Sequence, residues 1–273
     1  MSAHLASLVA TIPPPPFQNL HIGSLTLHGY GLTMGIAIVV AISVAEWGLK
    51  QQHVDTSRFT PFALACIVAG FVGARLYHVA SEPVRYWDHP EDIIKVWNGG
   101  LGIYGAVAAG AGVGLSIAPK FGIPRRAIAD AVAPALLFAQ AIGRFGNYLN
   151  QELFGGPFDG PWALEVDPKY RPPGYEDVAT FHPTFLYEQL GTLLLGVLFV
   201  VLLKRWSSRP RGILLPLYVS AYSLVRLCVE PVRIDFAHEL AGVRQNVWVA
   251  GTLVVAGLVI AWIMYRRDPA RRA

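Results

Sequence analysis

The sequence predicts an all-α integral membrane protein with about seven transmembrane helices. Hydrophobic residues make up 53% of the 273 residues and charged residues only 15%, whereas soluble domains carry roughly 25% charged residues. A helix that crosses the bilayer needs about 20 mostly apolar residues. Seven segments meet this requirement, namely residues 31–49, 61–80, 100–118, 127–148, 184–203, 212–229 and 247–265.

The distribution of basic residues predicts how these spans are oriented. Thirteen Lys and Arg residues lie at one set of ends: two after the first span, three before the fourth, four between the fifth and sixth, and four after the seventh. Only six lie at the opposite ends, mostly in longer loops. Because basic loops tend to stay in the cytoplasm, we expect the N-terminus outside and the C-terminus in the cytoplasm, which agrees with an odd number of spans.

The spans are expected to form a single domain, residues 1–273, with one long loop. Residues 151–183 are rich in Pro, Gly and aromatic residues and are too few for an independent domain. In this orientation they lie outside and form a small cap over a site. Residues 1–20 contain no Lys or Arg, and Pro13–Pro16 break any apolar run. We therefore expect an irregular outer arm there rather than a cleavable signal peptide.

Several classes of function are disfavoured. The net charge of +4 is small and fits loop topology better than a nucleic-acid surface. The histidines are scattered without paired-ligand spacing, and neither a P-loop nor a GxSxG elbow is present. Cys66 and Cys228 both fall in apolar spans, which favours packing residues over a disulfide or a nucleophile. We expect no metal, no cofactor and no nucleic-acid partner.

One polar stretch, Gly143–Gly155, stands out because it directly follows the apolar run 127–142. Ionisable groups at membrane depth usually face a polar cavity and mark a working site. Gly143 and Gly146 are expected to let another backbone or a ligand approach closely. If the stretch stays helical, residues at spacings of three and four share one face. These are Arg144, Asn147, Tyr148 and Gln151.

Polar residues also gather at the outer ends of other spans in the expected topology. They lie at residues 28–31, 97–104, 144–152, 182–188 and 226–233. Guanidinium groups such as Arg144 and Arg226 suit phosphate, and neighbouring amides suit hydroxyl and phosphoryl oxygens. The pattern favours a phospholipid headgroup of the outer leaflet as ligand.

Structural roles for the same arginines remain open. Arg226 and Glu230, four residues apart, would also neutralise each other and hold helices together. Arg75 fits a structural role, closing a helix pair near the cytoplasmic half, as well as it fits a functional one.

Gly143–Gly155 resembles the defining motif of the prolipoprotein diacylglyceryl transferase family, GRxGNFxNxExxG, and departs from it only at Tyr148, where the family has phenylalanine. Further similarities run in the family's order along nearly the whole chain. They are Tyr30-Gly31, Trp97-Asn98-Gly99-Gly100, His182-Pro183, Tyr187-Glu188, and Arg226 with Glu230 and Arg233.

The resemblance implies an enzyme of the bacterial cytoplasmic (inner) membrane whose active site faces the outer leaflet. The family transfers the diacylglyceryl group of phosphatidylglycerol to the lipobox cysteine of preprolipoproteins, forming a thioether and releasing glycerol phosphate, the first step of lipoprotein maturation. Its partners are therefore phosphatidylglycerol, lipobox signal peptides and membrane lipids. Carried over, the catalytic residues are Arg144, Arg226, Tyr104 and Glu152, and the substrate-binding residues are Tyr30, Asn147, Asn150, Gly155, His182, Glu230 and Arg233.

The group that accepts the thiol proton stays open at this stage. Many family members have a histidine where this chain has Tyr104, and a phenol with an ordinary pKa of about 10 is a poor base at pH 7. Tyr104 acts as a phenolate, or Glu152 or Glu230 takes the proton, or the position only lines the cavity. A transporter or a phospholipid sensor would use similar arginines, although no internal symmetry of the kind common in transporters is visible.

Overall fold

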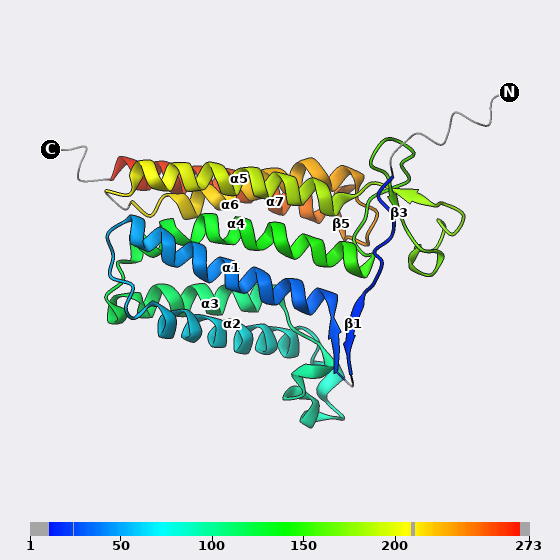
Figure 1. The fold of residues 1–273 in the computed structure, drawn as a ribbon, viewed down its shortest axis with the longest axis horizontal. Helices are drawn as coiled ribbons and strands as arrows, with labels where there is room; N and C mark the ends of the chain where they lie inside the picture. Colours follow the sequence, from blue (N-terminus) through cyan, green and yellow to red (C-terminus); the bar gives the residue numbers. More distant parts are fainter. Residues whose placement is uncertain (1–10, 24, 209–210, 268–273) are drawn as a thin grey trace.

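The computed structural model describes residues 11–23, 25–208 and 211–267. These residues form seven α-helices that run side by side in one bundle (Figure 1). The bounds are α1 Gly29–Gln51, α2 Phe59–Ser81, α3 Ile103–Ile117, α4 Arg125–Asn150, α5 Thr184–Trp206, α6 Leu214–Val229 and α7 Gln245–Arg266. Each expected span thus corresponds to one helix.

Five helices, α1, α2, α4, α5 and α7, are long and apolar enough to cross a membrane. The other two are shorter than the sequence suggested. Helix α3 begins at Ile103 because Gly99 and Gly100 adopt positive φ angles of +83° and +82°, which are incompatible with a helix. Helix α6 begins only after Gly212, whose φ is +75°. The chain has the character of a multi-pass membrane protein, and five spans are supported by length and composition.

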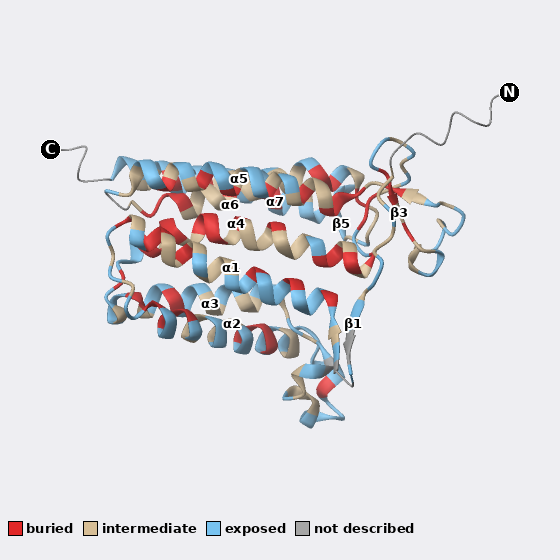
Figure 2. Cartoon of the chain, in the orientation of Figure 1, coloured by how far each residue is buried: buried red, intermediate tan, exposed pale blue. Residues whose placement is uncertain are grey.

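The outer surface of the bundle is apolar. Large side chains such as Leu76, Leu194 and Val255 are between 61% and 70% exposed, and Figure 2 shows exposed residues along the outward faces of the helices. Such a surface is rare on soluble monomers and suits contact with lipid. The central helix is α4, which packs against α1, α5 and α6 and carries the largest buried share among the apolar helices.

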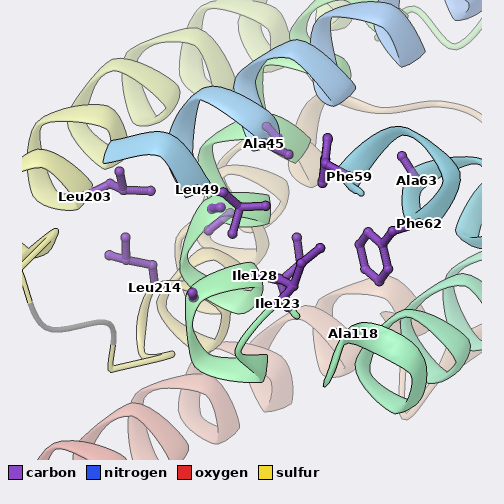
Figure 3. Packing of buried hydrophobic residues seen from close by; sticks show 14 of the residues in the cluster. Ala45, Leu49, Phe59, Phe62, Ala63, Ala118, Ile123, Ile128, Leu203 and Leu214 are labelled. Atoms are coloured by element: carbon purple, nitrogen blue, oxygen red, sulfur yellow. The ribbon is translucent and has the colours of Figure 1, made fainter. Parts of the chain in front are cut away.

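The main hydrophobic core lies where α1, α3 and α5 end and α2, α4 and α6 begin, at the end of the bundle away from the C-terminus of α4. Figure 3 shows how its side chains pack. Leu49, Ile123, Leu203 and Leu214 are almost completely buried there. The buried carboxylate of Asp130 strengthens this end, since it accepts hydrogen bonds from the backbone N–H groups of Arg211, Gly212 and Leu214 at 2.9, 2.8 and 2.9 Å. The helix ends are therefore closely packed and joined by hydrogen bonds at this end of the bundle.

Helices α2 and α3 form a closely packed hairpin. A Cβ placed at Gly73 or Gly105 would collide with the other helix, so small residues at these positions permit the contact. The short 3₁₀ helix η5, Ala118–Phe121, follows α3 and joins the hairpin to α4.

The loops at the other end contain short elements that the sequence reading did not predict. Three antiparallel two-stranded sheets form there: β1 Asn19–Ile22 with β2 Leu25–His28, β3 Leu164–Glu165 with β4 Thr180–Phe181, and β5 Glu239–Leu240 with β6 Val243–Arg244. The 3₁₀ helices are η2 Pro83–Tyr86, η3 Pro90–Ile93, η4 Val96–Asn98, η6 Pro168–Tyr170 and η7 Glu230–Val232.

Residues 151–183 contain a small hydrophobic cluster of their own. Phe154, Leu164, Val166 and Phe181 are buried in it, with Phe185 at the start of α5. The N-terminal segment is attached to this cluster, because the N–H of Ile12 donates to the Ala163 carbonyl at 2.8 Å and its carbonyl accepts from Glu165 at 2.9 Å. The expected irregular arm is thus anchored over residues 11–18, and residues 1–10 lie outside the described part.

Candidate active site

The carboxylate of Glu188 is the centre of a buried group of charges. Glu188 lies in the second turn of α5 and its side chain is 0% exposed. Its Oε1 atom lies 2.5 Å from Nη1 of Arg226 on α6 and 3.3 Å from Nη1 of Arg233. Its Oε2 atom is paired with Nη2 of Arg144 on α4. One carboxylate therefore holds three guanidinium groups from three parts of the chain.

Glu230 is the second buried carboxylate, at the start of η7 directly after α6. Its Oε2 atom lies 2.8 Å from Nη2 of Arg226, the pair spaced four residues apart that the sequence predicted. Its Oε1 atom accepts from Nε of Arg244 at 2.8 Å and from Nδ2 of Asn246 at 2.9 Å. Arg226 thus bridges the two carboxylates, and β6 and α7 are drawn into the group.

Asp235 completes the group, with Oδ1 2.7 Å from Nε of Arg233 and Oδ2 3.6 Å from Nη2 of Arg244. We call these seven residues the arginine cluster: Arg144, Glu188, Arg226, Glu230, Arg233, Asp235 and Arg244. Four guanidinium groups face three carboxylates, which leaves one positive charge in excess. The Arg144 and Arg226 side chains are each 18% exposed, so a further anion can reach them and complete the pairing.

Hydrogen bonds connect the rest of the motif to this cluster. Nη1 of Arg144 donates to Oδ1 of Asn147 at 3.2 Å, and Nδ2 of Asn147 donates to Oε1 of Glu152 at 2.9 Å. Asn150 makes a longer contact of 3.4 Å to the same oxygen. Helix α4 ends here because Gln151 adopts a left-handed φ of +51°. The turn places the exposed Glu152 carboxylate beyond the end of α4 while it stays coupled to Arg144.

Tyr30 lies against the motif helix, and Gly146 makes this contact feasible. A Cβ at Gly146 would lie 2.7 Å from Oγ1 of Thr33 and 2.8 Å from the Tyr30 ring. At Gly143 the nearest atom would be the Met34 sulfur at 3.7 Å, an ordinary contact. The neighbouring helix α1 therefore approaches closely at Gly146 but not at Gly143, where the approach of a ligand stays a prediction.

Gly155 brings the end of the motif into contact with two other segments near the arginine cluster, at His182 and at Val232. Its N–H donates to the His182 carbonyl at 2.8 Å, and a Cβ there would lie 2.6 Å from the Val232 carbonyl oxygen. His182 stacks on Phe158 at 4.2 Å between ring centroids, and burial lowers the pKa of its imidazole below the ordinary value of 6.5. Gly155 and His182 therefore contribute to the packing around the arginine cluster and not to its ion pairs.

Tyr104 does not join the arginine cluster in any contact among the described residues. It is 69% exposed near the start of α3, with its ring 5.8 Å from that of Tyr77.

Arg75, in contrast, is buried, and its guanidinium donates to backbone carbonyls of the loop between α2 and α3. That loop is at the same end of the bundle as the cluster, because α2 extends to Ser81 (Figure 1). The placement of Arg75 in the opposite half was therefore wrong.

Four residues of this region were absent from the predicted site: Glu188, Asp235, Arg244 and Asn246. Glu188 belongs to the polar run 182–188 and to the similarity Tyr187-Glu188, and it is the only acidic residue in α5, so the sequence did contain a signal for it. The other three lie beyond α6, where the sequence gives no indication that they turn back towards the cluster.

Comparison with known proteins identifies the family of the chain. The sequence model of the family described as prolipoprotein diacylglyceryl transferase matches residues 18–263, which is most of the chain. The chain belongs to this family. The resemblance that was noticed in residues 143–155 is thereby confirmed over nearly the full length.

Proteins of this name from three bacteria illustrate the similarity. A phosphatidylglycerol–prolipoprotein diacylglyceryl transferase of Frankia alni is 43% identical over 266 residues, covering 95% of this chain and 69% of the relative. A protein of the same name from Cutibacterium acnes is 40% identical, covering 94% and 88%. The enzyme numbered 2 from Streptomyces coelicolor is 40% identical, covering 96% and 83%. The similarity to members of the family therefore extends across the whole bundle.

Proposed function

We propose that this protein transfers the diacylglyceryl group of phosphatidylglycerol to the lipobox cysteine of preprolipoproteins, the first step of lipoprotein maturation. The observation that carries the proposal is the excess positive charge of the arginine cluster at one end of a membrane bundle. Phosphatidylglycerol places its anionic phosphate at the bilayer surface, at the level of such a cluster. The names of the relatives, which mention both substrates, support the same assignment.

In the proposed reaction the cysteine sulfur attacks the glyceryl carbon that bears the phosphodiester. A carbon–sulfur bond forms and the carbon–oxygen bond to phosphate breaks, so that glycerol phosphate leaves with the bonding electrons. The thiol proton passes to a base, and the phosphate changes from a monoanion to a dianion. Cations aimed at the developing charge stabilise the transition state.

Arg144 and Arg226 are the groups we assign to that phosphate. Both are partly exposed and both are held on the Glu188 carboxylate, one on each oxygen. The buried carboxylate fixes their positions before substrate arrives, which lowers the reorganisation that catalysis requires. Glu230 and Arg233 act as positioning residues, since each is paired within the cluster.

Glu152 is the best placed acceptor for the thiol proton. Its carboxylate is exposed and receives amide hydrogen bonds from Asn147 and Asn150, and among the described residues no guanidinium lies within ion-pair distance of it. Glu230 is occupied by two arginines. We assign Tyr104, which is 69% exposed, a role in lining the substrate cavity rather than in proton transfer. Tyr30, Asn147, Asn150, Gly155 and His182 complete the substrate-binding region.

In the membrane we propose seven spans in one domain, residues 1–273, with the N-terminus outside the cytoplasm. Helix α3 with η5 covers residues 103–121, and α6 with η7 covers residues 214–232; both are within the length of roughly 17–25 residues that a span needs. The arginine cluster then faces the outer leaflet of the bacterial cytoplasmic membrane. Residues 151–183 form a cap above it.

The test is an assay with purified protein, phosphatidylglycerol and a peptide that carries a lipobox cysteine. We expect the peptide to gain the mass of one diacylglyceryl group while glycerol phosphate is released. A peptide with serine in place of the cysteine is the matched control and gains nothing. A peptide that keeps its mass, while lipid still binds to the protein, contradicts the proposal and favours a lipid sensor.

A further inference from the structure

An open cavity of about 660 Å³, lined by both polar and apolar side chains, lies beyond the end of α4. Four separate segments surround it: the N-terminal arm, the end of the motif, the loop around η6 and the chain after η7. Its lining residues of interest here are Gln18, Asn150, Glu152, Lys169, Tyr170 and Asp235. The lining includes residues 150–154 of the motif and Asp235 of the arginine cluster, so the cavity borders the proposed active site.

The walls of this cavity are held in place by side-chain hydrogen bonds. The Tyr170 hydroxyl donates to Oε1 of Gln18 at 2.6 Å, which ties the N-terminal arm to the η6 loop. Gln151 and Asp167 are joined twice, at 2.7 and 2.8 Å. Leu153 has a left-handed φ of +56°, a conformation that is uncommon for a non-glycine residue. Unfavourable backbone geometry of this kind is often retained at ligand sites.

The charges around the cavity do not suit a phosphate. Glu152 and Lys169 are both exposed and carry opposite charges, and Asp235 is already paired with Arg233. A phosphate placed here meets one cation, Lys169, and the Glu152 carboxylate, which has amide partners but no cationic partner among the described residues. The arginine cluster instead offers excess positive charge. Mixed charges, amides and a phenol instead provide both donors and acceptors, which an extended polypeptide requires.

The position of the cavity indicates which part of a polypeptide it receives. Glu152 at its wall is connected through Asn147 to Arg144. A substrate whose thiol lies beside Glu152 must keep its apolar signal segment among the membrane helices. Its next residues then continue to the side of the bundle where α4 ends and the loops gather (Figure 1), which is where this cavity lies.

We propose that this cavity binds the first residues that follow the acceptor cysteine and that Lys169 favours acidic side chains there. This inference rests on the proposed transferase function and adds a specificity site to it. The cavity is large enough for a few residues of extended chain, since ligand sites commonly measure about 300–1,000 Å³.

A charge reversal tests the inference. Two lipobox peptides that differ only in Asp or Lys two residues after the cysteine are compared with the wild type and with Lys169→Glu at low salt. We expect the wild type to have the lower KM for the Asp peptide and the variant to reverse the order, so that the ratio of KM values changes at least about fivefold. The KM for phosphatidylglycerol stays unchanged. Lys120→Glu, at an exposed lysine in η5, is the matched control and leaves the ratio as in the wild type.

An unchanged peptide ratio in Lys169→Glu overturns the inference, and a change in the KM for phosphatidylglycerol alone assigns the cavity to the lipid headgroup instead. A second experiment does not depend on turnover. A peptide with serine at the cysteine position and a photoreactive phenylalanine two residues later is cross-linked to the protein and the adduct is mapped by mass. Adducts at residues 150–154 or 169–172 support the site even if no transfer is detected. Adducts elsewhere, or none, contradict it.

Discussion

Two sets of arginines at the same end of the bundle have different kinds of partner, backbone carbonyls in one set and carboxylates in the other. Arg75 donates to the carbonyls of Ile93, Gly99 and Gly100 at 2.7, 2.7 and 2.8 Å, and also to that of Asp92. Arg144 and Arg226 are instead paired with carboxylates. Through these hydrogen bonds to neutral carbonyls, Arg75 holds the loop between α2 and α3 in place. The cluster keeps a positive charge in excess, which an anionic substrate can neutralise. Under the proposed function Arg75 is structural because it is buried and carbonyls occupy its donors, whereas Arg144 and Arg226 bind the phosphate because their side chains remain partly exposed.

Replacing Arg226 is expected to have the largest effect on activity. Arg226→Ala removes one of the two cations assigned to the phosphate, and we expect the rate of transfer to fall at least about 100-fold, as for other groups that stabilise developing charge. Membrane insertion is retained, but the unfolding temperature is also expected to fall, because the buried carboxylates of Glu188 and Glu230 each lose a partner. The measurement is the peptide mass assay, with protein recovered in membranes as the control. A wild-type rate in Arg226→Ala or in Arg144→Ala contradicts the assignment.

Glu188→Gln tests the buried carboxylate that holds the cluster together. Three guanidinium groups lose their shared negative partner, and removal of one partner from a buried ion pair commonly costs about 3–5 kcal/mol. We expect a lower temperature of unfolding in detergent together with loss of transfer. Glu82→Gln changes an exposed glutamate with only long ion-pair contacts and serves as the control. Unchanged stability of Glu188→Gln is the result that would be incompatible with this arrangement.

Arg75→Gln is expected to loosen the loop without removing a catalytic charge. Several carbonyls of residues 92–100 lose their donor, each unsatisfied group costing about 1–3 kcal/mol. Hydrogen exchange in residues 82–102 therefore increases, whereas the KM for phosphatidylglycerol remains close to that of the wild type. If the variant instead lost lipid affinity while its loop stayed protected, the contrast between the two arginine types would fail.

Tyr104→Phe is expected to have a small effect on transfer, within about twofold, because the phenol has no described contact with the cluster. The variant keeps the ring beside Tyr77 and removes only the hydroxyl. The rate is measured over a range of pH in the same peptide assay. A loss of ten times or more, with a changed pH profile, would assign the hydroxyl a chemical role.

The smallest expected effect is the contribution of His182 to the pH dependence of stability. Burial lowers the pKa of its imidazole in the folded protein, so on acidification the unfolded chain takes up the proton first. Stability associated with this group is therefore fully present above the unfolded pKa of about 6.5 and is lost as the pH falls from there through the lowered pKa of the folded protein. We expect the unfolding temperature of the wild type to fall more between pH 8 and pH 5.5 than that of His182→Asn. His89→Asn, at an exposed histidine, should behave as the wild type.

Sequence reasoning located the helices well because apolar runs of sufficient length have few alternatives to a membrane span. It misjudged the two shorter helices, where Gly99, Gly100 and Gly212 adopt left-handed conformations that composition alone does not reveal. The short sheets were missed for a related reason, since segments of two to four residues carry little periodic signal.

The contacts of the site could likewise be predicted from the sequence only in part. The pair Arg226 and Glu230 could be predicted, because spacing along one helix fixes which side chains are neighbours. The contacts of Glu188 with Arg144 and Arg233 could not, since they depend on how α4, α5 and η7 are rotated against one another. Arg244 reaches Glu230 only because the β5–β6 hairpin turns the chain back.

The most direct test of the central claim measures lipid binding without catalysis. Purified wild-type protein and Arg144→Ala are each equilibrated with equal amounts of phosphatidylglycerol and diacylglycerol, and the retained lipids are identified by native mass spectrometry. If the arginine cluster binds phosphate, the wild type retains mainly phosphatidylglycerol and the variant loses this preference. The same preference in both proteins would show that the cluster does not recognise the phosphate.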